Sequence, residues 1–337
     1  MQRRRVIERI PVYVGRLCWA YLATAVVLWL TIRLGADRWW LATLIAYGPR
    51  WVWIVPAFAV LPAVLWLTRA RWRMGGVAAL AGLIVLFGVM GFRAPFPLRS
   101  GDGGRTIRVL SFNADGFGSG LGRFVDLIAQ VKPDFIAIQE SGGDPALAAT
   151  LGERGWHVVV HDGQTAASKF PVVRTDRILS LDTWRTAAVH YTLRTPFGEV
   201  VVATVHLDTP RHGFTPVLHR EAGAIVSLRR DIDYRRQGAR RAAAWIAGFG
   251  TPAIVAGDFN MPTDSAIFRE CWATPYTDSF LAAGFGLGNT KFTKLWGVRI
   301  DHVLVGPGWH VRRCRVGPDI GSDHCPLIAE LEYTGAR

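Results

Sequence analysis

Three long apolar segments in the first hundred residues constrain this chain more than any other feature. They are LCWAYLATAVVLWLTI (17–32), WVWIVPAFAVLPAVLWL (51–67) and MGGVAALAGLIVLFGVMGF (74–92), and none contains a charged residue. Each approaches the about 20 residues that a helix needs to cross the hydrocarbon core of a bilayer. The sequence therefore predicts three transmembrane helices, which form a membrane anchor over residues 1–92.

Two alternatives concern the ends of these segments. The basic stretch MQRRRVIER before the first one also fits a cleaved signal peptide, but no small-residue cleavage site follows and two further apolar segments do. The stretch WWLATLIAYG (39–48) is too short to span a bilayer alone. It either extends the second helix past Gly48, Pro49 and Arg50 or lies at the membrane interface, anchored by its two tryptophans.

Positive charge is concentrated in the same region of the chain. Residues 1–100 contain 13 arginines and two acidic residues, so they carry +11 of the formal net charge of +13. The remaining residues carry only +2, which argues against the broad positive field of a non-specific DNA-binding domain. The run RRDIDYRRQGARR (229–241) is interrupted by Asp231 and Asp233 and is interpreted as a solvated helix face.

The arginines also predict the topology of the anchor. They cluster in the N-terminal tail and again at Arg69, Arg71 and Arg73, between the second and third apolar segments. The positive-inside rule places both clusters in the cytoplasm. Three spans then place the C-terminal domain on the outer face of the cytoplasmic membrane, in a multi-pass protein. A disulfide between Cys271 and Cys314 is an option in that compartment.

The soluble part begins after a segment rich in Pro and Gly, RAPFPLRSGDGGR (93–105), which is typical of a linker. From residue 106 to 337, runs with strand character alternate with helical patterns. The runs AAVHYTLRT and EVVVATVHLD, separated by PFG, indicate a hairpin. Two helices are expected near residues 215–230 and 234–248. Hairpins mixed with crossovers favour an α+β domain of packed sheets under helices.

Polar residues of metal-ligand or acid–base type stand at the ends of several predicted strands. They are Asn113, Glu140, His206, Asp208, Asp258, Asn260, Asp301, His302, Asp323 and His324. A single stretch such as GDFN (257–260) favours a simple turn, because Gly, Asp and Asn end strands. Their repetition at strand ends indicates a functional site instead, since α/β sheets carry their sites there.

Seven motifs containing these residues run in a fixed order over residues 105–334. They are LSFNADG, IQE, SKFP, TVHLD, GDFN, RIDHVL and GSDHCPL. This ordered set resembles the endonuclease/exonuclease/phosphatase superfamily. The resemblance implies two packed mixed β-sheets flanked by helices, a four-layer sandwich. It also implies metal-dependent hydrolysis of a phosphate ester, with substrates that range in the family from DNA to phospholipid headgroups.

Phosphate-ester hydrolysis needs a hard cation, and Mg²⁺ prefers carboxylate and amide oxygens to sulfur or imidazole. Glu140 is the first candidate ligand, with Asn113 beside it. The resemblance adds Asp323 near the metal, and Mn²⁺ is the alternative ion. His302 is expected to pack within its strand.

The reaction also needs a group that takes a proton from the attacking water. Asp258 and His324 are both candidates, and the choice between them is left open. The resemblance implies that Asp301 orients the imidazole of His324, and that His206 contacts the phosphate or protonates the leaving oxygen. It further implies that Asn260 fixes the phosphate and the attacking water. Without the resemblance, Asp301 is equally expected to pair with an arginine such as Arg299.

The sequence thus predicts a membrane-anchored, Mg²⁺-dependent phosphodiesterase or nuclease-type hydrolase. Its partners are the membrane and a phosphate-ester substrate, either a lipid headgroup, a small diester or nucleic acid. The alternative is a non-catalytic module that uses the same fold to bind a phosphorylated ligand or a partner. Activity on DNA should fall steeply with salt, because each neutralised phosphate releases counterions. That dependence would separate a DNA substrate from a lipid one.

Overall fold

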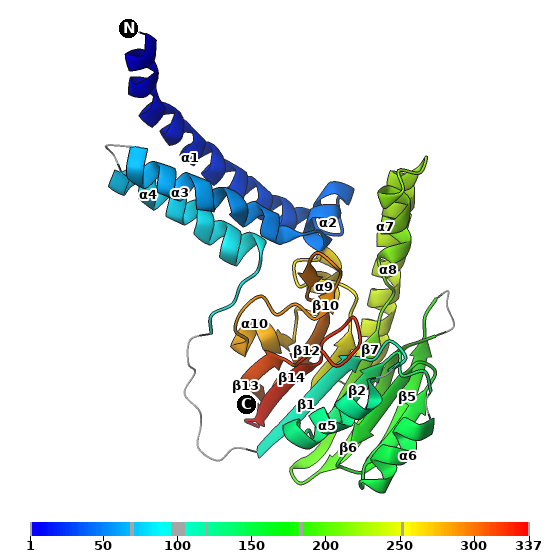
Figure 1. The fold of residues 1–337 in the computed structure, drawn as a ribbon. Coiled ribbons are helices and arrows are strands. Elements are labelled where there is room, and N and C mark those ends of the chain that lie inside the picture. Colours follow the sequence, from blue (N-terminus) through cyan, green and yellow to red (C-terminus); the bar gives the residue numbers. More distant parts are fainter. Residues whose placement is uncertain are drawn as a thin grey trace. The chain divides into compact units, whose positions relative to one another are not determined.

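A computed structural model describes residues 2–67, 71–95, 105–118, 120–143, 145–181, 185–250 and 253–335 (Figure 1). The chain divides into two compact units, Met1–Phe92 and Arg93–Arg337. Most of the predicted linker lies outside the described residues, because residues 96–104 are not among them. Its first residue, Arg93, exchanges two backbone hydrogen bonds of 2.8 Å with Gly286, so the second unit begins there.

The first unit is helical. Its elements are α1 (Gln2–Gly35), α2 (Trp40–Tyr47), the 3-10 turn η1 (Arg50–Ile54), α3 (Val55–Leu67), α4 (Arg71–Leu83) and the π-helical turn η2 (Ile84–Val89). In the described part, three stretches are long and apolar enough to cross a membrane: Ile10–Gly35, Arg50–Leu67 and Trp72–Val89. Only 6% of the second stretch is buried. A helix that is apolar all round and exposed needs an apolar surrounding such as lipid.

The segment 39–48 forms the separate short helix α2 and is not an extension of the second apolar helix. Its start is held by Asp37, whose backbone N–H donates to Thr43 Oγ1 at 2.9 Å and whose carboxylate accepts from Tyr47 Oη at 3.2 Å. Gly48 and Pro49 then interrupt the helix before η1 begins at Arg50. Proline lacks the N–H that would continue a helical hydrogen-bond ladder.

The second unit is built on two six-stranded sheets. The first has the order β13-β14-β1-β2-β4-β3 and the second the order β5-β6-β7-β8-β12-β9. The strands of the first are β1 (Arg105–Asn113), β2 (Phe135–Gln139), β3 (His157–His161), β4 (Gln164–Ser168), β13 (Trp309–Val316) and β14 (Leu327–Tyr333). The strands of the second are β5 (Val172–Leu179), β6 (Thr186–Thr195), β7 (Gly198–His206), β8 (Ile254–Asp258), β9 (Thr277–Asp278) and β12 (Asp301–Val305). Each sheet is mixed, with one parallel pair, β1–β2 or β7–β8.

Helices and one small hairpin complete this unit. They are α5 (Leu121–Val131), α6 (Pro145–Glu153), α7 (Arg211–Leu218), α8 (Ala224–Ala247), α9 (Ala266–Cys271), α10 (Ser279–Ala283), β10 (Lys291–Phe292) and β11 (Gly297–Val298). The core between the sheets joins residues such as Val109 and Phe135 to Val202 and Ile254. A second core packs α5 and α6 on the outer face of the first sheet. The predicted α+β sandwich is confirmed.

Two details of the sequence prediction are wrong. The two helices expected at 215–230 and 234–248 are the shorter α7 and the long α8, so the break lies at residues 219–223. Gly223, with φ of 78°, supplies the left-handed turn there. The run 229–241 is not a fully solvated face, because the Arg235 side chain is buried and donates to the backbone oxygen of Asn260 at 3.3 Å.

The disulfide considered between Cys271 and Cys314 is not formed. All four cysteines of the chain are free, and Cys314 is buried in the core between the sheets.

Candidate active site

Strand register brings distant parts of the chain together at one end of the second sheet. The parallel pair β7–β8 places His206 beside Asp258, and the antiparallel pair β8–β12 places Asp258 beside Asp301. In the first sheet, the parallel pair β1–β2 places Asn113 beside Gln139, so that Glu140 follows directly. Parallel neighbours end at the same edge of a sheet and an antiparallel neighbour begins there, which is why these side chains meet.

The stretch GDFN serves as both a turn and a site. Gly257 has φ of 145°, and a Cβ there would lie 2.0 Å from the backbone oxygen of Val205, so only glycine fits. Asp258 ends the strand, and its Oδ1 accepts the backbone N–H of Asn260 at 2.8 Å. Asn260 has φ of 52°, a left-handed conformation that asparagine tolerates. Its side-chain amide donates to the backbone oxygen of Leu207 at 2.8 Å.

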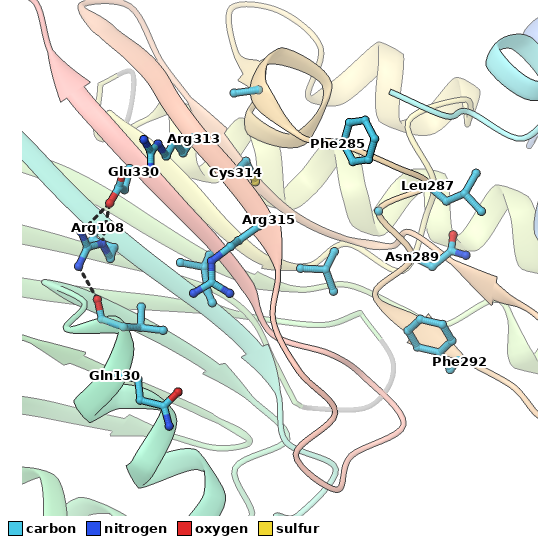
Figure 2. Close-up of a pocket in the computed structure, with 15 residues that line it drawn as sticks. Arg108, Gln130, Phe285, Leu287, Asn289, Phe292, Arg313, Cys314, Arg315 and Glu330 are labelled. Carbon is cyan, nitrogen blue, oxygen red and sulfur yellow. Dashed lines mark hydrogen bonds and ion pairs between the residues drawn. The ribbon is translucent and has the colours of Figure 1, made fainter. Parts of the chain in front are cut away.

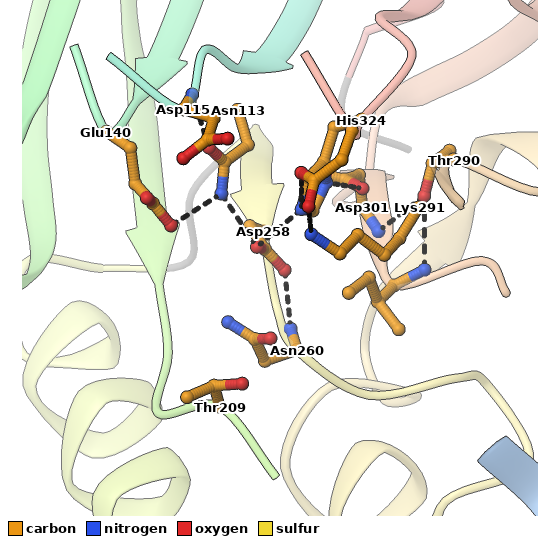
Figure 3. Close-up of polar contacts among 12 residues, drawn as sticks. Asn113, Asp115, Glu140, Thr209, Asp258, Asn260, Thr290, Lys291, Asp301 and His324 are labelled. Carbon is orange, nitrogen blue, oxygen red and sulfur yellow. Dashed lines mark hydrogen bonds and ion pairs between the residues drawn. The ribbon is translucent and has the colours of Figure 1, made fainter. Parts of the chain in front are cut away.

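Asn113 links two carboxylates across the sheets. Its Nδ2 donates to Glu140 Oε1 at 3.0 Å and to Asp258 Oδ2 at 3.1 Å (Figure 3). Glu140 has a left-handed backbone, with φ of 49°, which is unusual for a residue other than glycine or asparagine. Such outliers persist where the surroundings impose them, often at functional sites. His206 Nε2 lies 3.4 Å from the same oxygen, Glu140 Oε1.

The imidazole of His324 lies among three carboxylates. Its Nδ1 is 2.8 Å from Asp301 Oδ2, and its Nε2 is 3.8 Å from both Asp258 Oδ2 and Asp323 Oδ1. Ser322 Oγ accepts the backbone N–H of His324 at 3.0 Å and donates to the backbone oxygen of Asn113 at 2.8 Å. The GSDHCPL loop is therefore fastened to the end of β1.

These contacts shift the pKa values of the buried groups. Burial and the charge of Asp301 raise the pKa of Asp258 to about 6. Burial by itself would lower the pKa of His324, but the charge and hydrogen bond of Asp301, with the charge of Asp258, raise it to about 9. Burial would raise the pKa of Asp301, yet the charge and the hydrogen bond of His324 lower it. His324 therefore retains its proton at neutral pH, facing an ionised Asp301.

Two residues of the site carried no signal in the sequence. Lys291 forms an ion pair with Asp323 and a β-bridge with His324. Thr290 is buried, and its Oγ1 accepts the backbone N–H groups of Ile300 at 3.2 Å and Asp301 at 3.1 Å. No motif includes the stretch NTKF that contains both residues. Only the folding of this segment against β12 brings them to the site.

A cavity of about 500 Å³ opens at this end of the sheets. Of the predicted site residues, those that line it are Glu140, His206, Asp258, Asn260, Asp323 and His324. Asn113 and Asp301 stand behind them, through their contacts with Asp258 and His324. The cavity is also lined by Asp115, which lies within the LSFNADG motif, and by Arg185, which no motif contains. The structure thus brings every predicted site residue to this cavity or directly behind it.

Two groups of residues at the cavity are candidate metal ligands, and their donor atoms distinguish them. Within the described residues, one group of three potential ligands has its atoms within 4.8 Å of one another: Asp258, Asp301 and His324. In this group His324 Nδ1 and Asp301 Oδ2 are already engaged with each other, and all three side chains are buried. Glu140 and Asp323 instead offer carboxylate oxygens at the cavity surface. Hard cations prefer such oxygens, so the predicted set fits Mg²⁺ by donor type.

The model of the endonuclease/exonuclease/phosphatase family matches residues 110–324, more than half of the chain, and the chain therefore belongs to that family. Members of this family are nucleases and phosphatases, and they generally use divalent metal ions. No curated protein matches the chain significantly.

Solved structures support the same fold. The 3′ phosphatase NExo from Neisseria, bound to a product DNA hairpin, is 18% identical with a TM-score of 0.54 and covers 67% of this chain and 100% of its own. The endonuclease/exonuclease/phosphatase from Beutenbergia cavernae is 18% identical with a TM-score of 0.52, over 69% of this chain and 72% of its own. The human Nocturnin catalytic domain with bound sulfate is 18% identical with a TM-score of 0.51, over 68% and 95%.

Proposed function

We propose that this chain is a membrane-anchored, metal-dependent phosphoesterase that hydrolyses a phosphodiester by in-line attack of water. The observation that supports this most is the convergence of Glu140, Asp258 and His324 on one cavity, although the first and the last are 184 positions apart in the sequence. Family membership supports hydrolysis of a phosphate ester in general. It does not choose among substrates, because one fold supports many activities.

Glu140, Asn113 and Asp323 are the residues that we propose to hold Mg²⁺, with Mn²⁺ as the alternative ion. When bound, the ion supplies positive charge that stabilises the phosphoryl oxygens. The Glu140 side chain is 38% exposed, and its Oε1 is contacted by both Asn113 and His206. A ligand held in this way pays little ordering cost when a cation binds.

The contacts favour Asp258 as the group that takes the proton from water. Asn260 N–H and Asn113 Nδ2 each donate to one of its oxygens, so the carboxylate is held in an orientation that can accept a further proton. Burial by itself would lower the pKa of His324, but the charge and hydrogen bond of Asp301, with the charge of Asp258, raise it to about 9, which favours the imidazolium with a proton on both ring nitrogens. Its Nε2 can therefore donate to a phosphate oxygen, while His206 at the cavity wall serves the leaving oxygen.

The anchor is proposed to be a multi-pass segment of the cytoplasmic membrane, with the hydrolase unit on the outer face. Its support is the three apolar helices together with the arginine clusters in the tail and near Arg71. A C-terminal alkaline phosphatase fusion tests the orientation, because that reporter folds only outside the cytoplasm. Activity of an equivalent cytoplasmic reporter would reverse the assignment.

Two observations point in different directions on the substrate. NExo carries a product DNA hairpin, and zebrafish TDP2 carries a single-stranded DNA product, which favours nucleic acid. The net charge of only +2 on residues 101–337 and the membrane anchor favour a lipid headgroup or another small diester. We propose the second class, because a nucleic-acid track requires a positive field along the phosphates.

The test uses the full chain in detergent micelles or vesicles. Turnover of DNA, RNA, sphingomyelin, phosphoinositides and bis-para-nitrophenyl phosphate is measured with Mg²⁺ or Mn²⁺ and again with a chelator. Hydrolysis of a lipid or small diester that stops with chelator is expected, and Asp258→Asn should lower it by about 10²–10⁴-fold. Near-normal turnover in that variant would contradict the assignment of Asp258.

The alternative is a module that binds a phosphorylated ligand without cleaving it. Calorimetry would then detect binding of inorganic phosphate or a headgroup phosphate, with no turnover of any substrate in either metal. The presence of the complete acid–base set around Asp258 and His324 argues against that outcome.

A further inference from the structure

Two projections of the second unit carry exposed apolar side chains. One is the segment 284–298, in which Phe285 and Leu295 are each 73% exposed and Phe292 is 44% exposed. The other is the tip of the α7–α8 hairpin, where Leu218 is 75% exposed and Ile225 and Val226 are 41% and 53% exposed. We call these six residues the apolar rim. Large exposed apolar groups gathered in this way mark interaction surfaces.

Both projections stand beside the catalytic cavity. Lys291, in the first projection, lines the cavity, as do Arg211 of α7 and Asp231 of α8. Ile225 precedes Asp231 by six positions of α8, so the tip extends about 9 Å beyond the cavity lining. The α7–α8 hairpin can be followed in Figure 1 as it leaves the end of β7. The apolar rim therefore lies on the two projections of which other residues line the cavity.

Basic side chains accompany the apolar ones. In the segment 284–298 Lys294 is exposed and no residue is acidic, and residues 211–230 contain four arginines and a single acidic residue, Glu221. A groove of about 880 Å³ runs beside the first projection, with Phe285 and Phe292 on one side and Arg313 and Arg315 on the other (Figure 2). Aromatic and basic groups together are typical of surfaces that meet anionic headgroups.

Chain connectivity adds an independent reason to choose lipid as the occupant. The last candidate span ends at Val89, and Arg93 is already hydrogen-bonded to Gly286 of the first projection. Four extended residues reach at most about 14 Å. If the span crosses a bilayer, Gly286 and its neighbour Phe285 are therefore kept close to the membrane surface. A protein partner would have to compete with lipid for that position.

We propose that the apolar rim docks onto the surface of the lipid bilayer, so that the cavity mouth faces the headgroup layer. This inference rests on the membrane anchor and phosphoesterase activity proposed above, and it narrows the substrate to phosphate esters presented in the headgroup layer. Leu295 and Ile225 enter the interface, and Lys294 and Arg229 contact anionic headgroups beside them.

The experiment places an environment-sensitive NBD fluorophore on single introduced cysteines in the full chain, reconstituted in vesicles of phosphatidylcholine and phosphatidylglycerol. The labelled variants are Leu295→Cys, Ile225→Cys and Val173→Cys, and the parent chain supplies the blank for its own cysteines. Val173 is the matched control. It is 46% exposed, and its neighbour Val172 pairs with Leu193 at the end of the second sheet remote from His206.

Docking predicts a blue shift at Leu295 and Ile225 and loss of their emission when doxyl-labelled lipids are included, with neither effect at Val173. Emission at Leu295 as unquenched as at Val173 would overturn the proposal. So would a blue shift without lipid quenching that disappears on dilution to one chain per vesicle, because that result identifies a second copy of the chain as the occupant.

Measurements on the same labelled chain test membrane docking and the proposed hydrolase activity independently. His324→Ala in the Leu295→Cys background should abolish turnover and leave lipid quenching unchanged. Quenching without turnover of any substrate in the unaltered chain would reject the hydrolase and keep the docking surface. Turnover without quenching would reject the docking surface and keep the hydrolase.

Discussion

The second unit contains two buried Asp–His pairs built on consecutive residues of β12. His324 Nδ1 lies 2.8 Å from Asp301, and His302 Nδ1 lies 2.7 Å from Asp278. Successive residues of a strand point to opposite faces, so Asp301 serves the cavity and His302 points away from it. The two pairs thus have almost equal distances between histidine Nδ1 and the aspartate oxygen, but they lie in different surroundings.

The second ring nitrogen distinguishes the pairs. His302 Nε2 is 2.9 Å from the backbone oxygen of Met261, and the other oxygen of Asp278 accepts from Arg299 at 2.7 Å. His324 Nε2 instead faces the cavity, 3.8 Å from Asp258 and beyond hydrogen-bond distance. A pair in which both ring nitrogens have hydrogen-bond partners stabilises the fold, whereas a pair with one ring nitrogen facing the cavity can exchange a proton there. The pair geometry alone is thus a poor indicator of catalysis.

The largest expected difference between the pairs is in turnover. His324→Ala removes the imidazole at the cavity and should lower turnover of bis-para-nitrophenyl phosphate by about 10²–10⁴-fold. His302→Ala removes the sealed imidazole and should leave turnover within a few-fold, while it lowers the unfolding midpoint. Steady-state kinetics and thermal unfolding of both variants, in the full chain, check this. Equal losses of turnover in the two variants would contradict the distinction.

The second difference is in stability. Asp278→Asn leaves the buried guanidinium of Arg299 without its charge partner, and removal of one partner of a buried pair costs about 3–5 kcal/mol. The Arg299 and Asp278 side chains are only 9% and 3% exposed. Asp323→Asn is the control, because that side chain is 44% exposed and should cost less than about 1 kcal/mol. Urea unfolding measures both, and similar losses would refute the assignment.

The sequence predicted the strand ends of the site well, because each strand has its own apolar pattern and a polar residue where that pattern stops. It also predicted that His302 packs within its strand, which its buried side chain bears out, but it did not reveal which groups hold His302 there. That outcome depends on Asp278, which lies in the stretch YTDSF without a motif, and on Arg299, which pairs with Asp278 and not with Asp301. The roles assigned to the individual site residues stay predictions.

Tertiary contacts explain the other omissions. Thr290 and Lys291 reach the site only because their segment folds against β12, and nothing in their local sequence specifies that contact. Arg235 was assigned to a solvated face from its charged neighbours, yet the packing of α8 buries it beside Asn260. Local pattern specifies elements and their ends, whereas contacts between distant segments decide which polar groups share a site.

The third difference is in the response to acid. Burial by itself would raise the pKa of Asp278, but the charge of Arg299 and the contacts of His302 hold it well below its usual range. A carboxyl group whose pKa is lower in the folded than in the unfolded state stabilises the fold at pH values above its unfolded pKa of about 3.9. This stabilisation is lost as the pH falls towards the pKa of the folded state. The unfolding free energy should therefore decrease below about pH 5, by at most about 1.4 kcal/mol per pH unit from this group. Urea unfolding across this range should show a shallower slope in Asp278→Asn, and an unchanged slope would reject the pairing as its cause.

The smallest expected difference is between two ion pairs, Lys291–Asp323 at the cavity and Arg299–Asp278 in the interior. Lys291 pairs with Asp323, and these side chains are 18% and 44% exposed, so solvent screens their attraction. Lys291→Met should change the unfolding free energy by less than about 1 kcal/mol, and added salt should remove the difference. Arg299→Met should cost as much as Asp278→Asn at every salt concentration, because salt does not reach a buried pair. A loss of unfolding free energy in Lys291→Met that persists at high salt would show that the Lys291–Asp323 pair is as shielded from solvent as the Arg299–Asp278 pair. That result would remove the structural basis for treating only His324 as open to a substrate.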